Sequence, residues 1–497
     1  HDSGALQTNF GAGKTGSSEE AEKGTTPAAT VAGRLMLFRS MGKNAFGHIQ
    51  DKTGRIQVMC NRDTTIVDGY TPQAAGDEEL LSHHKFIEKK LDIGDIIGVE
   101  GHLFHTQKGE LTIYAKKLTL LSKSLLPLPE KHSGLTDKEQ RYRKRWLDLI
   151  MRNDVQKTFR DRSTILHLVR TFFAELEFIE VETPVLQSIY GGAQAKPFTT
   201  HLNALDQDMF LRISLEIPLK KLIVGGMDRV FEIGRVFRNE GIDRTHNPEF
   251  TMLEAYAAYW DYKDMMRAME TLFERIALAM HSTTVIAVHD PETGTTTQVD
   301  LKAPWIRMTM KESIKHYAKI DVDSLSDDEI RKILVSDEEM SPGDLAKCSR
   351  GLLIAHLFET KVEQHLIQPH HIIDHPIETT PLCKLHRNPH EKSQGIIERF
   401  ESFILGKEMS NAYSELNDPL LQRSLLEEQA ARKAAGDEEA NPLDDEFIEA
   451  ISQGMPPTGG LGIGIDRLVM LFTNSHSIRD VLYFPLMRPE KEASQPS

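Results

Sequence analysis

Three adjacent stretches decide the fold of this chain. Residues 231–237 read FEIGRVF, residues 238–249 read RNEGIDRTHNPE, and residues 250–256 read FTMLEAY. The outer two alternate between apolar and polar side chains, and the polar stretch between them contains a proline. This pattern predicts a β-hairpin with a long loop. Alternate residues of a strand point to one face of a sheet. The candidate functional residues of the hairpin are all even-numbered: Arg238, Glu240, Phe250, Glu254 and Tyr256.

A glycine-rich run near the C-terminus carries a second arginine. Residues 459–467 read GGLGIGIDR. Glycines at alternate positions of a strand leave room for a ligand or for close packing. A helix that begins near Ile465 places Arg467 at its N-terminal end, where an anion is favoured. A buried strand–helix junction explains the glycines but not the pair Asp466 and Arg467.

The two arginines point to a phosphate ligand. Guanidinium is a permanent cation, and its planar fork of donors matches phosphate oxygens. Arg238, before the hairpin loop, and Arg467, after the glycine-rich strand, can hold a triphosphate from two sides. Phe250 offers a stacking face for adenine, and Glu240 offers an acceptor for the adenine amino group. The alternative interpretation is a surface hairpin with ordinary salt bridges.

Two carboxylates form a candidate metal site. Residues 401–408 read ESFILGKE, so Glu401 and Glu408 are seven positions apart. On a strand followed by a turn they can converge on a divalent cation that bridges triphosphate oxygens. Such spacing is also common in solvated surface charge. The sequence MSNAYSELND that follows at 409–418 favours the metal site.

Length and composition indicate a globular protein of two or three domains. The chain has 497 residues, of which 39% are hydrophobic and 27% are charged, as in globular proteins. No apolar run reaches the roughly 18 residues of a membrane span. The polar N-terminus has no apolar core of a secretion signal, and the three cysteines lie far apart, which favours a reducing compartment. We therefore expect a cytoplasmic protein without a membrane segment.

The charge is unevenly distributed along the chain. The net charge is −15, which argues against general affinity for nucleic acids. Residues 31–123, however, contain 13 Lys and Arg against 11 Asp and Glu. This region is therefore the better candidate for contact with a polyanion.

Composition and periodicity divide the chain into five segments. Residues 1–30 are polar without a hydrophobic period, which predicts a disordered tail. Short strand-like segments with turn signals, and helical spacing at 79–90, predict a five-stranded OB barrel over residues 31–123. The proline-containing segment 124–145 is a linker. A larger folded domain over 146–490 and a polar tail over 491–497 complete the division.

The domain over 146–490 is predicted to be α+β. Asn153 is expected to cap a helix that ends near Leu176. The strand-like segments that follow show no regular β-α-β alternation, which favours an antiparallel sheet with flanking helices over a doubly wound parallel sheet. Residues 300–385 are expected to form a peripheral insertion.

These motifs resemble those of a known family. The hairpin and the glycine-rich run resemble motifs 2 and 3 of class II aminoacyl-tRNA synthetases, and residues 178–186, FIEVETPVL, resemble motif 1. Over about residues 31–490 the chain is similar to lysyl-tRNA synthetases. In that family motif 1 builds the interface of a homodimer, and the barrel binds the anticodon.

The resemblance implies a role for each site residue. For the ATP substrate it implies Arg238 at the α-phosphate, Arg467 and His246 at the γ-phosphate, and Glu240, Asn247 and Phe250 nearby, with Mg²⁺ held by Glu401 and Glu408. For lysine it implies Gly192, Glu216 at the α-amino group, Glu254, Tyr256 and Glu415 around the ε-ammonium, Asn411 at the carboxylate and Tyr413 over the stem. For the anticodon it implies stacking on Phe46, with Arg39, Gln57 and Glu110 beside it.

The chain departs from the family pattern at two places in the lysine site. The family often has Phe where this chain has Tyr413, so the added hydroxyl needs a partner. Residues 217–220 read IPLK, where LYLK is usual in bacterial members.

The resemblance implies that the chain is a ligase that makes aminoacyl-tRNA. Lysine is activated by ATP to lysyl-adenylate with release of pyrophosphate, and the lysyl group is then transferred to the 3′ end of tRNA(Lys). The alternative is an aspartyl- or asparaginyl-type enzyme, whose anionic substrate needs a nearby cation, whereas Glu254 and Glu415 are acidic. Two further alternatives are a paralogue that modifies lysines of proteins, against which the barrel argues, and a non-enzymatic OB-fold RNA binder.

Overall fold

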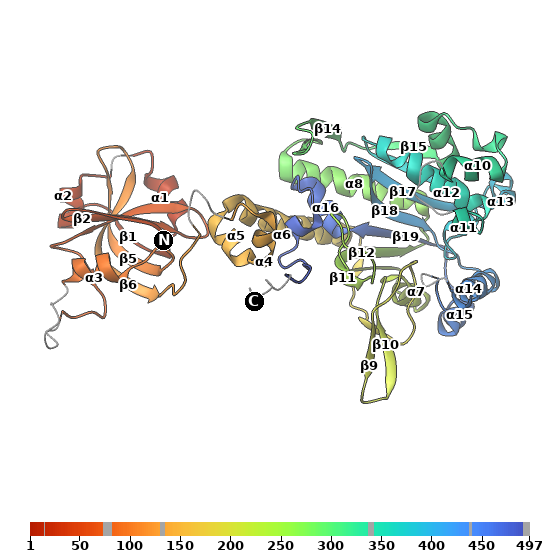
Figure 1. The fold of residues 1–497 in the computed structure, drawn as a ribbon, viewed down its shortest axis with the longest axis horizontal. Coiled ribbons are helices and arrows are strands. Elements are labelled where there is room, and N and C mark those ends of the chain that lie inside the picture. The colour runs from red at the N-terminus through yellow and green to blue at the C-terminus, as the bar shows by residue number, and fades with distance from the viewer. Residues whose placement is uncertain (14, 73–81, 130–134, 336–341, 437–439, 491–497) are drawn as a thin grey trace, which may run out of the picture. The chain divides into compact units, whose positions relative to one another are not determined.

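The computed structural model describes the chain except residue 14 and the segments 73–81, 130–134, 336–341, 437–439 and 491–497. The chain separates into two units, residues 1–136 and 137–497 (Figure 1). The boundary falls inside the segment 124–145 that the sequence suggests as a linker. The polar tail expected at 491–497 lies outside the described residues.

The first unit contains the β-barrel that the sequence predicts. Its sheet has the order β3-β2-β1-β5-β6-β4, and β3 also pairs with β6, which closes the ring. Helix α3 (His83–Lys90) precedes β5 and lies within the expected helical stretch, whose residues 79–81 are outside the described part. The fold class is confirmed for this unit. The strands are β1 (Ala28–Met41), β2 (Asn44–Gln50), β3 (Arg55–Asn61), β4 (Ile66–Val67), β5 (Ile96–His105) and β6 (Leu111–Ser122).

The described part of residues 1–30 contains regular secondary structure, in contrast to the disordered tail expected for this segment. It contains helices α1 (Ser3–Phe10) and α2 (Ser18–Lys23) and the start of β1. Leu6 of α1 is buried in the barrel core, and Ala21 of α2 is buried in a smaller cluster on the barrel. Asp2 caps α1, and Ser17 with Glu20 forms a capping box on α2. One buried apolar residue per helix is too few to produce a hydrophobic period in the sequence. Together with the caps, these contacts suffice to dock both helices.

The second unit is built on an eight-stranded, mostly antiparallel sheet, which confirms the α+β prediction. Only the β7–β11 and β15–β16 pairs are parallel among its described strands. Helices α6 (Asn153–Glu175), α8 (Tyr262–His281) and α16 (Ile465–Phe472) share one apolar core with the sheet (Figure 1). In sheet order the strands are β15 (Ile306–Thr309), β16 (His370–Pro376), β17 (Ile396–Ile404), β18 (Lys407–Ser414), β19 (Thr458–Gly464), β12 (Glu249–Ala258), β11 (Arg229–Phe237) and β7 (Ile179–Glu180).

Smaller elements surround this sheet. Strands β8, β9 and β10 form a separate three-stranded sheet, and β13 and β14 form a hairpin. The strands are β8 (Leu186–Gln187), β9 (Thr199–Leu202), β10 (Gln207–Leu211), β13 (Val285–His289) and β14 (Thr296–Asp300). The other helices are α4 (Lys138–Arg143), α5 (Arg145–Met151), α7 (Glu216–Val224), α9 (Met310–Ser313), α10 (Asp327–Val335), α11 (Pro342–Leu345), α12 (Arg350–Lys361), α13 (Pro389–Ser393), α14 (Pro419–Ala434), α15 (Asp445–Ser452) and α17 (Ile478–Val481).

Two local predictions for this unit are wrong. Asn153 is the first residue of α6 rather than its cap, because Arg152 precedes it in an extended conformation without a capping side-chain bond. Residues 300–385 are not wholly peripheral, because β15 and β16 extend the main sheet beside β17. The part that follows β15 forms a second apolar cluster around α10 and α12, to which Ile372 of β16 and Phe403 of β17 also contribute.

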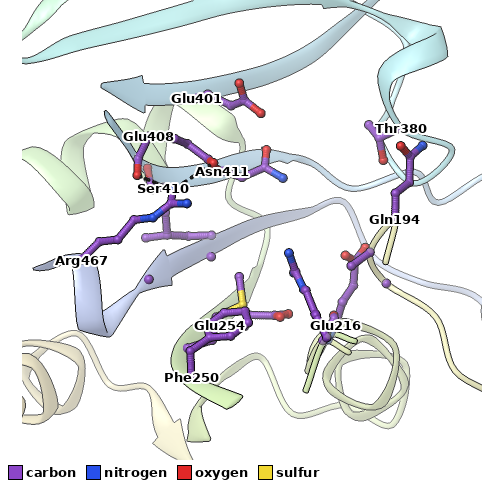
Figure 2. Close-up of a pocket in the computed structure, with 18 of the residues that line it drawn as sticks. Gln194, Glu216, Phe250, Glu254, Thr380, Glu401, Glu408, Ser410, Asn411 and Arg467 are labelled. Carbon is purple, nitrogen blue, oxygen red and sulfur yellow. Dashed lines mark hydrogen bonds and ion pairs between the residues drawn. The ribbon is translucent and has the colours of Figure 1, made fainter. Parts of the chain in front are cut away.

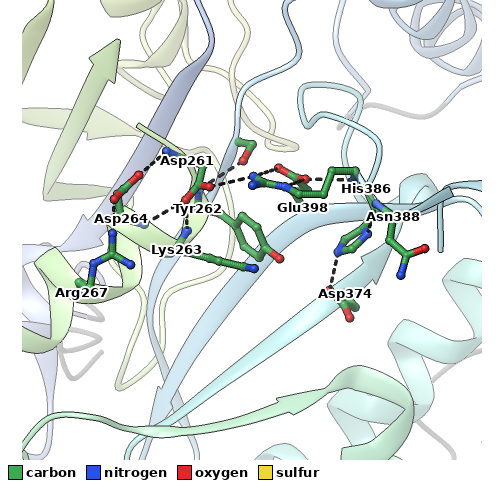
Figure 3. Close-up of polar contacts among 11 residues, drawn as sticks. Asp261, Tyr262, Lys263, Asp264, Arg267, Asp374, His386, Asn388 and Glu398 are labelled. Carbon is green, nitrogen blue, oxygen red and sulfur yellow. Dashed lines mark hydrogen bonds and ion pairs between the residues drawn. The ribbon is translucent and has the colours of Figure 1, made fainter. Parts of the chain in front are cut away.

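A polar network joins the start of α8 to β17 (Figure 3). Asp261 caps α8 by accepting from the backbone N–H groups of Lys263 and Asp264. Arg387 lies 2.9 Å from Asp261 Oδ2 and donates to Glu398 Oε2 of β17 at 2.9 Å. The helix and the strand are therefore fixed together on the sheet that carries the pocket described below.

Among the helices of the described segments, none has both the length and the apolar character needed to cross a membrane.

Candidate active site

A pocket on the main sheet collects the predicted residues of the ATP, lysine and metal sites. Figure 2 shows Arg467 and Glu408 at one end of it, and Glu216 with Gln194 at the other. Asn411 and Glu401 lie on the strands between these ends. The predicted lining residues are Gly192, Glu216, Arg238, Glu240, His246, Asn247, Phe250, Glu254, Tyr256, Glu401, Glu408, Asn411, Tyr413, Glu415 and Arg467.

Strand register explains why residues far apart in sequence meet here. Glu254 of β12 pairs with Gly462 of β19, which pairs with Asn411 of β18, which pairs with Glu401 of β17. These four residues form one row across the sheet. A second row lies two residues away along each strand, on the same face, and contains Tyr256, Gly460, Tyr413 and Arg399. Directly paired residues project from the same face of a sheet. Both rows therefore present their side chains to one pocket.

The alternating glycines of β19 make room in these rows. A Cβ at Gly460 would overlap Glu415 Oε1 and lie 2.7 Å from Tyr256 Cε1. A Cβ at Gly462 would lie 3.1 Å from Met252 Cε. Gly460 is therefore needed so that Glu415 and Tyr256 can approach each other across the strand.

Three buried glutamates form the acidic end of the pocket. Glu216, Glu254 and Glu415 are 4%, 3% and 1% exposed. Glu254 accepts from the N–H of Leu215 and from the Tyr256 hydroxyl, each at 2.9 Å. The Tyr413 hydroxyl, for which the sequence requires a partner, donates to Glu216 Oε1 at 2.7 Å.

Burial changes the ionisation of this acidic end. Desolvation, with the charge of Glu216 adding to it, raises the pKa of Glu254 to about 7. Desolvation also raises the pKa of Glu415 well above its usual range, although Lys220 opposes the shift. Because carboxylates are destabilised when they are buried close together, this end of the pocket favours a cationic ligand.

Arg238 and Phe250 lie together in the pocket. The guanidinium carbon of Arg238 is 5.3 Å from the centre of the Phe250 ring, and Arg238 Nε donates to the carbonyl of Ile213 at 3.3 Å. Desolvation lowers the pKa of Arg238, while the charges of Glu240 and Glu408 oppose this. The guanidinium remains a cation at neutral pH, because the ordinary pKa of arginine is so high.

Arg467 is held by the loop and the strand on either side of it. It donates to the Glu408 carbonyl at 2.7 Å and to Glu408 Oε2 at 3.2 Å, and its Nη2 lies 3.3 Å from His246 Nε2. Its neighbour Asp466 is buried and accepts from Arg162 at 2.6 Å and from the N–H of Thr251 at 2.7 Å. Asp466 therefore joins the start of α16 to β12.

The carboxylates near Arg467 fit a divalent cation. Desolvation, opposed by Arg399 and reinforced by Glu408, raises the pKa of Glu401 to about 7. The pKa of Glu363 rises to about 8 by desolvation and the charges of Glu401, Glu359 and Glu408. In the described part of the chain, no group of three acidic, His or Cys side chains is placed to hold a metal by itself. Mg²⁺ usually needs only one or two carboxylates, because substrate phosphates complete its shell.

Sequence reasoning missed three residues that line or support the pocket. Arg399 donates to Asn411 Oδ1 at 3.0 Å and to Glu401 Oε1 at 2.5 Å. Lys220 donates to Glu216 Oε1 at 2.5 Å, and Asn441 lines the pocket with a buried Oδ1 that lacks a partner among the described residues. Strand period two could have indicated Arg399 from Glu401, and the four-residue helical spacing could have indicated Lys220 from Glu216. No sequence signal indicates Asn441.

The anticodon candidates lie in the barrel. The Arg39 guanidinium is 5.8 Å from the centre of the half-buried Phe46 ring, which packs beside Met59, Phe104 and Tyr114. Gln57 is buried, donates to Glu110 Oε2 at 2.7 Å and accepts from Thr112 at 2.9 Å.

A fifth residue connects these two pairs. His48, which sequence reasoning missed, is two positions from Phe46 and pairs with Gln57 across the strands. Its Nε2 is 2.8 Å from Glu110 Oε1. The structure therefore gathers all four candidates on one face of the barrel, with His48 among them.

Comparison with known proteins agrees with this geometry. Residues 137–488 match the family described as tRNA synthetases class II (D, K and N), and residues 29–121 match the OB-fold nucleic acid binding domain. A lysine--tRNA ligase of Chlamydia pneumoniae is 56% identical over 97% of this chain and 90% of its own length. Those of Moorella thermoacetica and Nostoc punctiforme are both 47% identical over 93% of this chain, and over 89% and 79% of their own lengths. The chain therefore belongs to the lysyl-tRNA synthetases, within the class II tRNA synthetases of the D, K and N group.

Proposed function

We propose that this chain joins L-lysine to tRNA(Lys) at the expense of ATP. The observation that supports the proposal is the difference in charge between the two ends of the pocket. One end has three buried glutamates suited to a cationic amino acid, and the other has Arg238 and Arg467, suited to a triphosphate.

In the first step the substrate carboxylate attacks the α-phosphorus of ATP. The bond from that phosphorus to the bridging oxygen breaks, and pyrophosphate leaves. Arg238 stabilises the charge that develops on the α-phosphate, and Arg467 with His246 holds the far phosphates. Asn411 holds the attacking carboxylate, because Arg399 occupies its Oδ1 and leaves the Nδ2 donors for the substrate.

A divalent cation belongs to this step as a bound partner of ATP. Glu401 and Glu408 would hold Mg²⁺, which neutralises triphosphate charge when bound.

In the second step the terminal ribose hydroxyl of the tRNA attacks the activated carbonyl, and AMP leaves. No protein nucleophile is needed, so the residues contribute positioning and charge stabilisation.

For the barrel we propose anticodon binding. Phe46 has a half-buried ring on which a base can stack, and Arg39 and Glu110 are exposed beside it. Gln57 is engaged at both ends of its amide, so we assign it the role of holding Glu110 in place, and we add His48 to the binding face.

For motif 1 we propose the interface of a homodimer. Ile179, Val185 and Leu186 are exposed on this segment of the monomer, at 54%, 38% and 45%. Exposed apolar side chains grouped on one segment favour association. We also propose a cytoplasmic location, where tRNA is charged.

The test is ATP–pyrophosphate exchange measured with each of the twenty amino acids. We expect exchange with lysine alone. Aspartate is the critical competitor, because the buried cation Lys220 contacts two of the glutamates that line the pocket. Lys220, however, contacts both Glu216 and Glu415, so it leaves the acidic end with a net negative charge. Efficient exchange with aspartate or asparagine would replace the lysine assignment with the alternative enzyme class.

A further inference from the structure

Lys220 occupies an unusual position at the acidic end of the pocket. It lies one helical turn after Glu216 on α7, and its side chain is completely buried. Its ammonium contacts Glu216 Oε1 at 2.5 Å and also Glu415 Oε2. The rings of Tyr413 and Phe447 lie 5.5 and 5.9 Å from the same nitrogen.

A buried ammonium requires an explanation, because an apolar side chain would fill the same space at lower cost. Lys220 faces Glu216, Glu415 and two aromatic rings, and Glu254 lies in the same pocket. Without Lys220 the acidic end would contain three buried carboxylates, and Glu216 and Glu415 would lose the ammonium that contacts both of them. Its ammonium therefore compensates one negative charge of the three.

The remaining charge matches the proposed substrate. When Glu216, Glu254 and Glu415 are all ionised, three carboxylates and one ammonium leave two negative charges. Lysine carries two ammonium groups, and their proximity favours the ionised form of these carboxylates. We infer that Lys220 is a positioning residue that sets specificity: it holds Glu216 and Glu415 and adjusts the pocket to the two positive charges of a diamino acid. The inference rests on the proposed function.

The hydrogen bonds show which oxygens are left for the substrate. Within the described part of the chain, Lys220 and Tyr413 both bond to Oε1 of Glu216, so Oε2 is available to the α-ammonium. In Glu415, Oε2 contacts Lys220, whereas Oε1 is buried and lacks a hydrogen-bond partner among the described residues. Each carboxylate thus offers one oxygen to Lys220 and the other to an ammonium of lysine.

The experiment measures KM and kcat for lysine and ATP in the exchange assay. Lys220→Met keeps the length and apolar stem but removes the charge. We expect the lysine KM to rise at least about ten-fold, with the ATP KM within about two-fold, because one partner of a buried charge cluster is lost. The matched control is Lys221→Met on the same helix, whose ammonium pairs with the exposed Glu446. It should leave both KM values unchanged.

A double variant separates charge balance from packing. Glu415→Gln alone leaves one net negative charge, and adding Lys220→Met restores two. We therefore expect Lys220→Met to raise the lysine KM in the wild-type background but to lower it in the Glu415→Gln background. A packing role of Lys220 would give the same sign in both.

Each outcome has a defined meaning. A lysine KM for Lys220→Met within two-fold of the wild type, or a double variant no better than Glu415→Gln, overturns the inference. If Lys220→Met does not fold, the comparison of the double variant with Glu415→Gln decides, since removing both partners of a buried pair is better tolerated than removing one. If the wild type itself fails to activate lysine, the proposed function is refuted instead.

Discussion

Replacing Gly460 with alanine adds one methyl group at the tightest point of the lysine site. The added carbon would overlap Glu415 Oε1 and lie 2.7 Å from Tyr256 Cε1. Both side chains are almost completely buried, so neither can move aside without disturbing its neighbours. Such overpacking costs about 1–3 kcal/mol. If the cost falls on lysine binding, it corresponds to about a 5- to 150-fold increase in the lysine KM.

The assay is lysine-dependent ATP–pyrophosphate exchange, with the ATP KM measured in parallel. Gly464→Ala is the matched control on the same strand, because its added carbon would lie 3.8 Å from the nearest atoms of Arg467, an ordinary contact distance. We expect Gly460→Ala to raise the lysine KM and Gly464→Ala to leave it within two-fold. An unchanged lysine KM in a natively folded Gly460→Ala protein would refute the placement of Glu415 and Tyr256 around the substrate.

Further predictions concern Arg238, the barrel and the acidic end of the pocket. Arg238→Ala should abolish exchange while circular dichroism stays native, since loss of one transition-state contact costs about 3–4 kcal/mol; near-normal exchange would contradict its role. Phe46→Ala should weaken tRNA charging but spare exchange, because base stacking contributes about 1–3 kcal/mol; a parallel fall in exchange would make Phe46 a core residue. Because the pKa of Glu254 is about 7, this carboxyl is mostly protonated at pH 6 and ionised at pH 8, so the lysine KM should fall over that range; a constant KM would contradict this. Norleucine, which lacks the ε-ammonium, should be a very poor substrate, and Glu415→Gln should raise the lysine KM with little change for ATP; efficient norleucine activation would remove the charge argument.

Local sequence patterns predicted the parts of the molecule that depend on neighbours in the chain. The alternation at 231–237 and 250–256 predicted a hairpin, and the register of β11 with β12 confirms it. The short apolar segments of residues 31–123 likewise predicted the barrel. The signal for the hairpin is a period of two, and the signal for the barrel is a series of short apolar segments separated by turn residues.

Long-range pairing was beyond such patterns. Glu254 and Glu401 lie at the same level only because β19 and β18 stand between their strands. The sequence assigned no role to Lys220, which appears there only within the string 217–220. Its role depends on a contact with Glu415, almost two hundred residues further along the chain. The N-terminal helices were missed because docking by single residues such as Leu6 leaves no hydrophobic period.

The hydrogen bonds that Asp466 accepts affect the entropy cost of nucleotide binding. Asp466 connects three elements, since it accepts from Arg162 of α6 and from the backbone of Thr251 in β12 while it belongs to α16. Arg238 is followed by the loop that leads into β12, and Arg467 is the next residue after Asp466. The two arginines therefore extend from elements that Asp466 already joins. Preorganisation of this kind lowers the conformational entropy that is lost when the two guanidinium groups are fixed on the phosphates.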